Sequence, residues 1–399
     1  MTEELEQALR RTLTAAAERA PKAPPGIGLD SRPARRPRGY PRVALAAAAV
    51  ALAIGGATVG GRTLLTGMHA SGSSKTGASP ALHRLKKTAV PAMEKVWPQA
   101  IHRVPATLPN GRRFQPLTFL DAHTLLVNTE FSFEKADALY AYDLRKHTTR
   151  RITTVVTPAK TKMFASYFTT GDGYVAWAFA GDYGAEVWAA PLAGGEAHRV
   201  ARTDATTLDH LAIDGGNVYW SLTRSPGVYR APIAGGTARL VEGTGSAYIL
   251  QWPWVGSPRD SLGTATNVRF ATIKNVRTGE TRSARLTDRA AWHCGLTWCV
   301  GQTKNFVTEA QRRDGGGRHA IPDVERMMVV PPSLDRFVIT KPAGGTIAVY
   351  DLKTGLTGDL GVTSGKKQQL GWVVPQEPGN PLYYTVTDGG YVLVDLAAI

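Results

Sequence analysis

The sequence lacks the short motifs that usually carry catalysis or metal binding. It has no G-x-S-x-G nucleophile motif and no phosphate-binding P-loop, and none of its nine histidines forms an H-x-H or H-E-x-x-H pair. Cysteine is nearly absent: only Cys294 and Cys299 occur, which excludes a four-cysteine zinc site and a disulfide-rich scaffold. We therefore assign no catalytic, cofactor-binding or metal-binding residue and expect no cofactor.

Acidic residues are the minority charge, with 32 against 47 basic ones and a formal net charge of +15. A basic balance can indicate binding to nucleic acid or to an anionic membrane. Residues 1–42 hold nine of the basic and five of the acidic residues, so the excess is spread along the chain. No aromatic-plus-basic recognition motif accompanies it, and we expect no nucleic-acid partner.

One long stretch, residues 43–61, lacks charge entirely and is rich in Ala, Val and Gly. Nineteen residues at the helical rise nearly span a hydrocarbon core of about 30 Å. A buried soluble helix or a cleaved signal peptide are the alternatives, but 42 residues are long for a signal n-region. By the positive-inside rule the N-terminus is cytoplasmic and residues 66–399 lie outside, because five arginines precede the stretch: Arg32, Arg35, Arg36, Arg38 and Arg42.

The chain thus divides into four parts: a cytoplasmic segment 1–42, a single transmembrane helix 43–65, a flexible stalk 66–99, and a folded domain 100–399. In the first part, Leu5, Leu9 and Leu13 are four residues apart and predict a short amphipathic helix. This helix either docks on a cytoplasmic partner or forms only beside the membrane. The stalk is rich in Ser, Gly and Thr, which is typical of flexible linkers.

The folded domain contains a sequence repeat. Each copy has a run of alternating apolar residues, a Pro or Asp residue, a glycine-containing turn and another short strand. Seven copies recur at a mean step of about 42 residues, within the blade period of propellers. A second hairpin precedes each copy, so each repeat predicts a four-stranded antiparallel blade. The copies align on Leu144, Leu192, Ile233, Val276, Gln311, Leu352 and Leu396.

The repeat predicts an all-β fold, a seven-bladed β-propeller whose last blade lacks a fourth strand at the C-terminus. Residues 101–108 precede the first blade and are available to complete the seventh. Pro105 in this segment favours an outer, edge position, because proline cannot donate to a sheet ladder. We expect this segment to close the ring.

The phrases VYRAPIAGGTARLV and VWAAPLAGGEAHRV resemble the strand–GG–strand units of TolB-like β-propellers. The N-terminal plan is similar to that of single-pass actinobacterial membrane proteins with extracytoplasmic propellers. The resemblance covers about residues 100–399 as a repeat style and 1–65 as a topology. It implies the fold and the topology, and it transfers no site residue, since propellers host many unrelated functions.

The two cysteines lie in AWHCGLTWCVGQT, where one strand is expected to end and the next to begin. Opposed positions of a hairpin bring side chains close enough for a disulfide, which an extracytoplasmic location favours. A buried thiol pair and half of a metal site are the alternatives, and the spacing is poor for zinc. His293 is expected on the opposite face of the strand from Cys294.

Five aspartates recur near the predicted hairpin turns. They are compatible with a calcium site or an acid–base site, but we prefer the interpretation that they form the turns. Trp252 and Trp254 in QWPWVGSP are suited to stacking on a sugar or peptide, although aromatics at this spacing usually belong to a blade core. The aspartates are Asp121, Asp172, Asp214, Asp335 and Asp388.

A ligand surface is expected on the loops between the second and third strands of the blades. These loops mix both charges without repeating, which suits a protein, peptide or cell-wall partner better than a small-molecule site. The predicted partner-binding residues are Glu134, Lys135, Asp137, Asp182, Tyr183, Arg224, Arg259 and Asp260.

The leading functional hypothesis is a non-catalytic binding, scaffold or sensing module held at the cell membrane, with its propeller outside. One alternative is a transmembrane regulator that couples an external signal to a cytoplasmic partner through the N-terminal helix. The other is a propeller-type hydrolase or lactonase, which would need carboxylates or a cofactor cage near the ring axis.

Overall fold

The computed structural model describes residues 90–132, 135–182, 184–205, 207–223, 225–256, 269–286, 291–302, 307–321, 331–340, 346–361, 382–385 and 390–399. All of them belong to the compact unit Val50–Ile399. The predicted cytoplasmic segment, transmembrane helix and most of the stalk lie outside these residues. Within the described ranges, no helix has the length and apolar character needed to cross a membrane.

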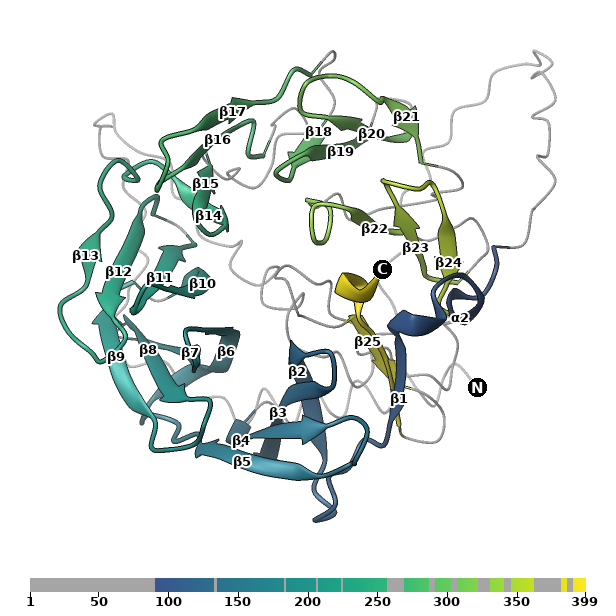
Figure 1. The fold of residues 1–399 in the computed structure, drawn as a ribbon. Coiled ribbons are helices and arrows are strands. Elements are labelled where there is room, and N and C mark those ends of the chain that lie inside the picture. Colours follow the sequence, from purple (N-terminus) through teal and green to yellow (C-terminus); the bar gives the residue numbers. More distant parts are fainter. Residues whose placement is uncertain are drawn as a thin grey trace, which may run out of the picture. The chain divides into compact units, whose positions relative to one another are not determined.

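Seven antiparallel sheets, numbered here in chain order, follow one another around a ring (Figure 1). Sheet 1 contains β2 (Phe114–Asp121), β3 (Thr124–Ser132), β4 (Lys135–Asp143) and β5 (Thr149–Thr154). Sheet 2 contains β6 (Thr161–Gly171), β7 (Tyr174–Gly181), β8 (Gly184–Pro191) and β9 (His198–Thr203). Sheet 3 contains β10 (Leu208–Asp214), β11 (Asn217–Leu222), β12 (Val228–Pro232) and β13 (Arg239–Leu240).

The strands of the remaining sheets are shorter. Sheet 4 contains β14 (Tyr248–Gln251), β15 (Trp254–Gly256), β16 (Thr272–Asn275) and β17 (Thr281–Ser283). Sheet 5 contains β18 (Ala291–Cys294), β19 (Trp298–Gln302), β20 (Thr308–Arg312) and β21 (His319–Ala320). Sheet 6 contains β22 (Phe337–Thr340), β23 (Ala348–Asp351) and β24 (Thr357–Asp359), and sheet 7 contains β25 (Leu382–Thr385), β26 (Tyr391–Val394) and β1 (Ile101–Val104).

Each sheet packs both faces against its neighbours, as the repeat predicts. In β7, Val175, Trp177 and Phe179 join a buried cluster with sheet 1, whereas Ala176 and the alternate alanines join one with sheet 3. Side chains alternate between the faces of a strand, so an apolar run on both faces fits a sheet buried between two others. Similar clusters join the sheets around the rest of the ring. The propeller arrangement therefore follows from the packing of the described residues.

The ring closes through β1, which confirms the predicted role of the segment before the first blade. β1 pairs antiparallel with β26, from Ile101 opposite Val394 to Val104 opposite Tyr391, and lies at the edge of sheet 7. The Tyr391 hydroxyl then donates a hydrogen bond to the Phe114 carbonyl in sheet 1 at 2.7 Å. The first and last strands of the domain are thus joined in one sheet.

The domain begins earlier than the predicted boundary at residue 100. The α-helix α2 (Met93–Val96) and the 3-10 helix η2 (Pro98–Ala100) pack against sheets 6 and 7, with Met93 and Trp97 buried. Trp97 contacts Phe337 edge-on, with ring centroids 6.5 Å apart. Gly358 makes this packing possible, because a Cβ atom there would lie 2.8 Å from the Trp97 ring. Residues 90–99, predicted as the end of the stalk, belong instead to the propeller.

The predicted alignment of the sequence repeats is wrong by two residues in sheet 5. The backbone N–H of Leu144 donates to the His123 carbonyl just after a third strand, and Leu192, Ile233, Val276 and Leu352 make the matching bond in their sheets. In sheet 5 this bond comes from Arg313, to the Thr297 carbonyl at 2.8 Å, while Gln311 lies within β20. A buried arginine therefore occupies a position that leucine, isoleucine or valine fills elsewhere.

Cys294 and Cys299 form a disulfide, as predicted, with an S–S distance of 2.00 Å. They face each other in the register of β18 and β19, and both are fully buried. Because adjacent strand residues point to opposite faces, His293 is directed away from the disulfide. His293 is also buried, and burial together with the charge of Arg269 lowers the pKa of its imidazole to about 3.

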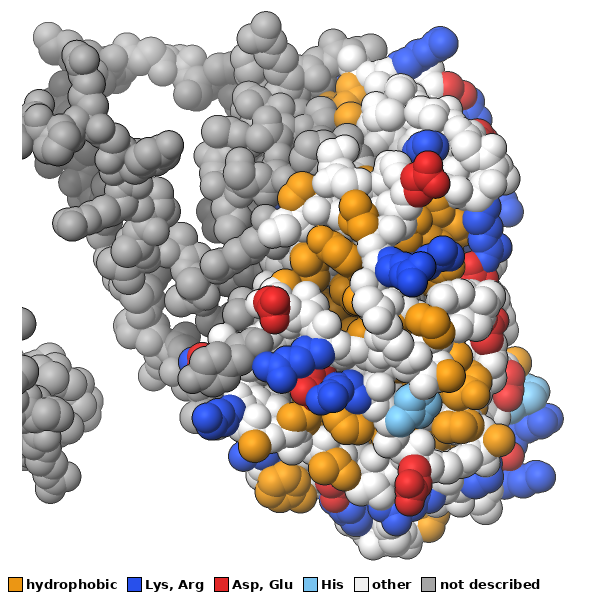
Figure 2. Space-filling view, turned by 90° about the vertical axis from the view of Figure 1, so that its left-hand side faces the viewer, with side chains coloured by type: hydrophobic (Ala, Val, Ile, Leu, Met, Phe, Trp, Pro, Cys, Tyr) orange, Lys and Arg blue, Asp and Glu red, His pale blue; other side chains and the backbone are white. Residues whose placement is uncertain are grey.

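The outer flank on the side of β9, β12 and β13 (Figure 2) exposes basic, acidic and hydrophobic side chains interspersed with one another. No single sign of charge dominates this view. The picture agrees with a positive charge that the sequence distributes along the whole chain.

Candidate functional site

Carboxylates at the first hairpin turns connect neighbouring sheets. Asp172, in the turn between β6 and β7, accepts a hydrogen bond from the Gly216 N–H of sheet 3 at 2.8 Å. Asp335, in the turn before β22, accepts from the Thr297 and Trp298 N–H groups of sheet 5 at 2.9 and 3.2 Å. Burial raises the pKa of the Asp335 carboxyl, and these N–H groups oppose the shift. The turn interpretation is correct for these residues, but they also tie one sheet to the next.

Of the remaining predicted turn aspartates, Asp121 makes a different contact and Asp388 is not described by the structure. Asp121 bonds only within its own turn among the contacts of the described residues, accepting from the His123 N–H at 2.7 Å. Backbone hydrogen bonds from His123 and Thr124 lower its pKa despite opposition from burial. Asp388 lies outside the described residues.

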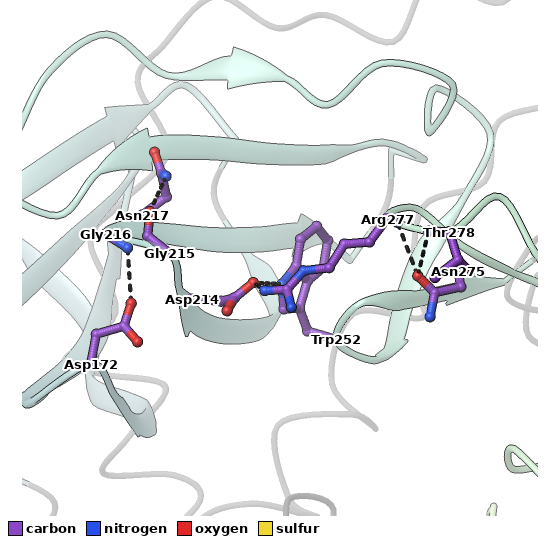
Figure 3. Close-up of polar contacts among 9 residues, drawn as sticks. All are labelled: Asp172, Asp214, Gly215, Gly216, Asn217, Trp252, Asn275, Arg277 and Thr278. Carbon is purple, nitrogen blue, oxygen red and sulfur yellow. Dashed lines mark hydrogen bonds and ion pairs between the residues drawn. The ribbon is translucent and has the colours of Figure 1, made fainter.

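Asp214 organises the most developed polar group at this end of the ring (Figure 3). It is the last residue of β10 and accepts a hydrogen bond from the indole N–H of Trp252, in the first turn of sheet 4, at 2.9 Å. The same carboxylate oxygen forms an ion pair with the guanidinium of Arg277, which comes from the turn between β16 and β17. Three separate turns from two sheets thus converge on one carboxylate.

The surrounding contacts hold this group in place. The Asn275 side-chain oxygen accepts from the backbone N–H of Arg277 at 2.9 Å and of Thr278 at 3.2 Å, which fixes the turn that carries the guanidinium. The Trp252 ring stacks on Tyr219 of sheet 3, with centroids 3.8 Å apart and planes at 25°. Both contacts limit the freedom of the side chains before any ligand binds, so less conformational entropy is lost on binding.

Beside this group lies a cleft of about 280 Å³, which we call the first-turn cleft. This volume is slightly below the range of about 300–1,000 Å³ that is typical of drug-sized ligand sites. Its walls come from sheets 1 to 4. The lining residues are Thr118, Thr169, Thr170, Ala212, Ile213, Asp214, Gln251, Trp252, Pro253 and Arg277.

The lining offers hydrogen-bonding groups and one compensated ion pair. Among the lining residues, Thr169, Thr170 and Gln251 carry side chains that can donate or accept hydrogen bonds. The Arg277 side chain is 54% exposed, so its guanidinium keeps accessible donors beyond those used by Asp214. In the described part of the chain, no group of three or more His, Cys, Asp or Glu side chains is placed to hold a metal ion. The arrangement can bind a polar, extended ligand.

The sequence pointed to two of these residues and missed the others. The sequence marks Trp252 as a residue suited to stacking and predicts Asp214 in a turn. Trp254 belongs to the core, with 8% exposure, and packs under the Arg282 guanidinium at 4.4 Å from its ring centroid. Arg277 gave no signal because its partner is 63 residues away in sequence and on another sheet.

The predicted partner-binding loops lie at the other ends of the strands. Lys135 is placed with its ammonium 5.7 Å from the Phe131 ring centroid and 5.1 Å from that of Phe164. Asp137 accepts from the Thr129 hydroxyl at 2.6 Å and pairs with Arg112 at 2.6 Å, and Asp182 pairs with Lys162. Five predicted loop residues are outside the described ranges: Glu134, Tyr183, Arg224, Arg259 and Asp260.

A scan against protein-family models finds no match, and no curated protein matches in sequence. Similar solved structures include a mutant puromycin hydrolase complexed with PGG, at 14% identity and a TM-score of 0.43 over 70% of this chain and half of that one. BamB from Moraxella catarrhalis has 13% identity and a TM-score of 0.37, covering 71% of this chain and 83% of its own. TolB from Acinetobacter baumannii has 15% identity and a TM-score of 0.33, covering 55% of this chain and 62% of its own.

At these identities and TM-scores, the likeness supports no statement about activity. The fold assignment rests on the seven sheets of the described residues and on the buried clusters that join them.

Proposed function

We propose that this protein is a binding module held at the outer face of a cell membrane, with the first-turn cleft as its ligand site. The observation that carries the proposal is the convergence of Asp214, Trp252 and Arg277 at the edge of a cleft whose lining includes threonine and glutamine residues. Four consecutive sheets contribute to the lining, so the site depends on their packing side by side. Such a site forms a surface that recognises a partner without changing it chemically.

An extended peptide segment is the ligand class that the lining fits best. The hydroxyls and the Gln251 amide match the alternating N–H and carbonyl groups of a peptide backbone. The exposed donors of Arg277 match a carboxylate, whether a side chain or a C-terminus. The small volume limits the bound part to one or two residues, with the rest of the partner lying on the surface outside.

The extracytoplasmic placement draws on two independent features. Disulfides persist in oxidising compartments, and Cys294 and Cys299 form one. The charge-free stretch 43–61 with its preceding arginines predicts a single span with the C-terminal domain outside.

Binding is tested by selecting peptides from a displayed library on the full-length chain in lipid nanodiscs. We expect enriched sequences with an acidic residue or a free C-terminus, and an affinity loss of about tenfold or more for Arg277→Gln, equal to the roughly 1.5–3 kcal/mol of a charged hydrogen bond. Arg239→Gln is the matched control, because Arg239 is an exposed arginine on β13 and not part of the cleft lining. Equal affinities for wild type and Arg277→Gln would refute the cleft as the binding site.

Topology is tested separately with protease added to intact protoplasts. We expect digestion of an epitope at the C-terminus and survival of one at the N-terminus. A protected C-terminal epitope would refute the outside placement while leaving the peptide-binding result untouched.

A further inference from the structure

A hydrophobic and basic patch lies at the end of the ring opposite the first-turn cleft. Phe131, at the end of β3, is 67% exposed, and Val156, after β5, is 64% exposed. The Lys135 ammonium lies between Phe131 and the partly exposed Phe164, and connects the two rings. The backbone N–H of Val155 donates to the Asp137 carbonyl at 2.8 Å, which places Val156 beside the same strand. We call Phe131, Lys135, Val156 and Phe164 the second-turn patch.

Large apolar side chains exposed to this extent are a notable feature of a protein surface. Phe131 and Val156 are the two most exposed large hydrophobic residues of the described chain, and they come from β3 and from the segment after β5, which lie on either side of β4. Grouped exposed apolar residues usually mark a contact surface. Sheet 1 does not need them for stability, because its own core consists of other, fully buried residues.

A positive charge within the patch favours an anionic partner. The Lys135 ammonium lies beside both aromatic rings. Two nearby acids are already paired with cations outside the patch, Asp137 with Arg112 and Asp182 with Lys162. Aromatic rings next to lysines suit the boundary of an anionic bilayer, where rings enter the acyl region and ammonium groups reach the phosphates.

We propose that the second-turn patch rests on the anionic surface of the membrane to which the chain is anchored. The inference rests on the proposed anchoring, which keeps the domain close to lipid. A tether raises the effective concentration of the surface to the millimolar range, so a contact of few residues is enough. In this orientation, the first-turn cleft, at the opposite strand ends, is turned away from the lipid and toward its ligands.

The test places a fluorophore on a single new cysteine in the full-length chain, since both native cysteines are buried in their disulfide. Ser132→Cys reports from the patch, and Thr278→Cys, an exposed position in the turn of Arg277, reports from the cleft end. Each labelled protein is reconstituted in vesicles of phosphatidylcholine with an equal amount of phosphatidylglycerol, or of phosphatidylcholine alone. Quenching by a lipid-borne nitroxide is then measured.

We expect several-fold stronger quenching at position 132 than at position 278, and a marked decrease without the anionic lipid. Phe131→Asp combined with Val156→Asp should abolish the difference without unfolding the domain, because both side chains are exposed. Equal quenching at the two positions, or quenching unaffected by the double substitution, would overturn the proposal, as would docking that appears only when a protein partner is added.

Flotation of the vesicles separates this inference from the anchoring on which it rests. If the chain does not float with the vesicles, the proposed span is wrong. If it floats but the label at position 132 remains unquenched, only the patch assignment fails.

Discussion

Closure of the ring by the N-terminal segment, residues 93–104, can be tested quantitatively. Trp97 is 4% exposed and packs between Phe337 and Gly358, so it joins the segment before β1 to sheet 6. Trp97→Ala removes a large buried side chain and leaves a cavity in a rigid surrounding. Such substitutions cost about 3–5 kcal/mol, a large fraction of the roughly 5–15 kcal/mol that stabilises a typical domain.

The measurement is urea unfolding of a fragment beginning at residue 85, followed by far-ultraviolet circular dichroism. With a slope of about 3 kcal/mol per molar, the midpoint should fall by roughly 1 to 1.7 M. Hydrogen exchange should locate the effect: amides of β1 and β26 should lose protection, while those of β10 to β12 keep it, because they lie across the ring.

Phe131→Ala is the control, since it truncates an aromatic ring that is already exposed and should change stability by no more than about 0.5 kcal/mol. A fragment beginning at Phe114 gives the extreme case, because it lacks β1 and leaves β26 with an open edge. We expect it to aggregate, since unpaired edges and uncovered apolar faces promote association. A midpoint for Trp97→Ala equal to that of the control, with a soluble and cooperative short fragment, would refute closure through this segment.

Three further perturbations test individual residues, each by urea midpoints. Cys299→Ser opens a loop with a sequence separation of 5 and should cost about 2 kcal/mol by loop entropy, leaving the fold intact; complete unfolding would contradict this estimate. Arg313→Met leaves three backbone carbonyls without their charged donor and should cost about 3–5 kcal/mol; a loss below about 1 kcal/mol would show that the bonds contribute little. His293 stays neutral in the folded state to about pH 3 but binds a proton below pH 6.5 when unfolded. The free energy of unfolding should therefore fall by about 1.4 kcal/mol for each unit by which the pH is lowered from 6.5 toward 3. The decrease should be less steep in His293→Gln.

The fold was predictable because its signal repeats. Gly turns and apolar runs recur at nearly equal steps, and each copy supports the others, so the seven sheets and the closing strand were expected in outline. The disulfide was predictable for a local reason: two cysteines across a short hairpin must face each other if the strands pair. The domain start was predicted too late because Met93 and Trp97 lie in no repeat and make their contacts with sheets 6 and 7.

The cleft was less accessible to sequence reasoning. Asp172, Asp214 and Asp335 looked alike as turn aspartates, yet each makes its strongest contact with another sheet. Such contacts depend on how consecutive blades are rotated about the ring axis, and that rotation has no local sequence pattern. Arg277 likewise became a candidate only when its turn was seen beside Asp214.

Arg313 shows how a single charged residue can replace an apolar one at a structural position of the repeat. Its guanidinium donates to the carbonyl of Gly295 at 2.7 Å and to those of Phe270 and Ala271 at 2.7 and 3.0 Å. Burial lowers its pKa to about 10, a shift that the nearby charge of Asp335 opposes, so the group remains charged at neutral pH.

Arg313 follows β20 of sheet 5 and donates to carbonyls that directly precede β16 of sheet 4, so it joins these two sheets. Their strands have two to five residues each, whereas those of sheets 1 and 2 have six to eleven, so each strand has fewer side chains with which to bury apolar surface. Apolar contacts are non-directional, whereas three hydrogen bonds from one planar group fix the relative position of the chains that accept them. Arg313 therefore fixes the relative position of sheets 4 and 5 through directional hydrogen bonds, which accounts for a buried charged residue at a position that is apolar in other repeats.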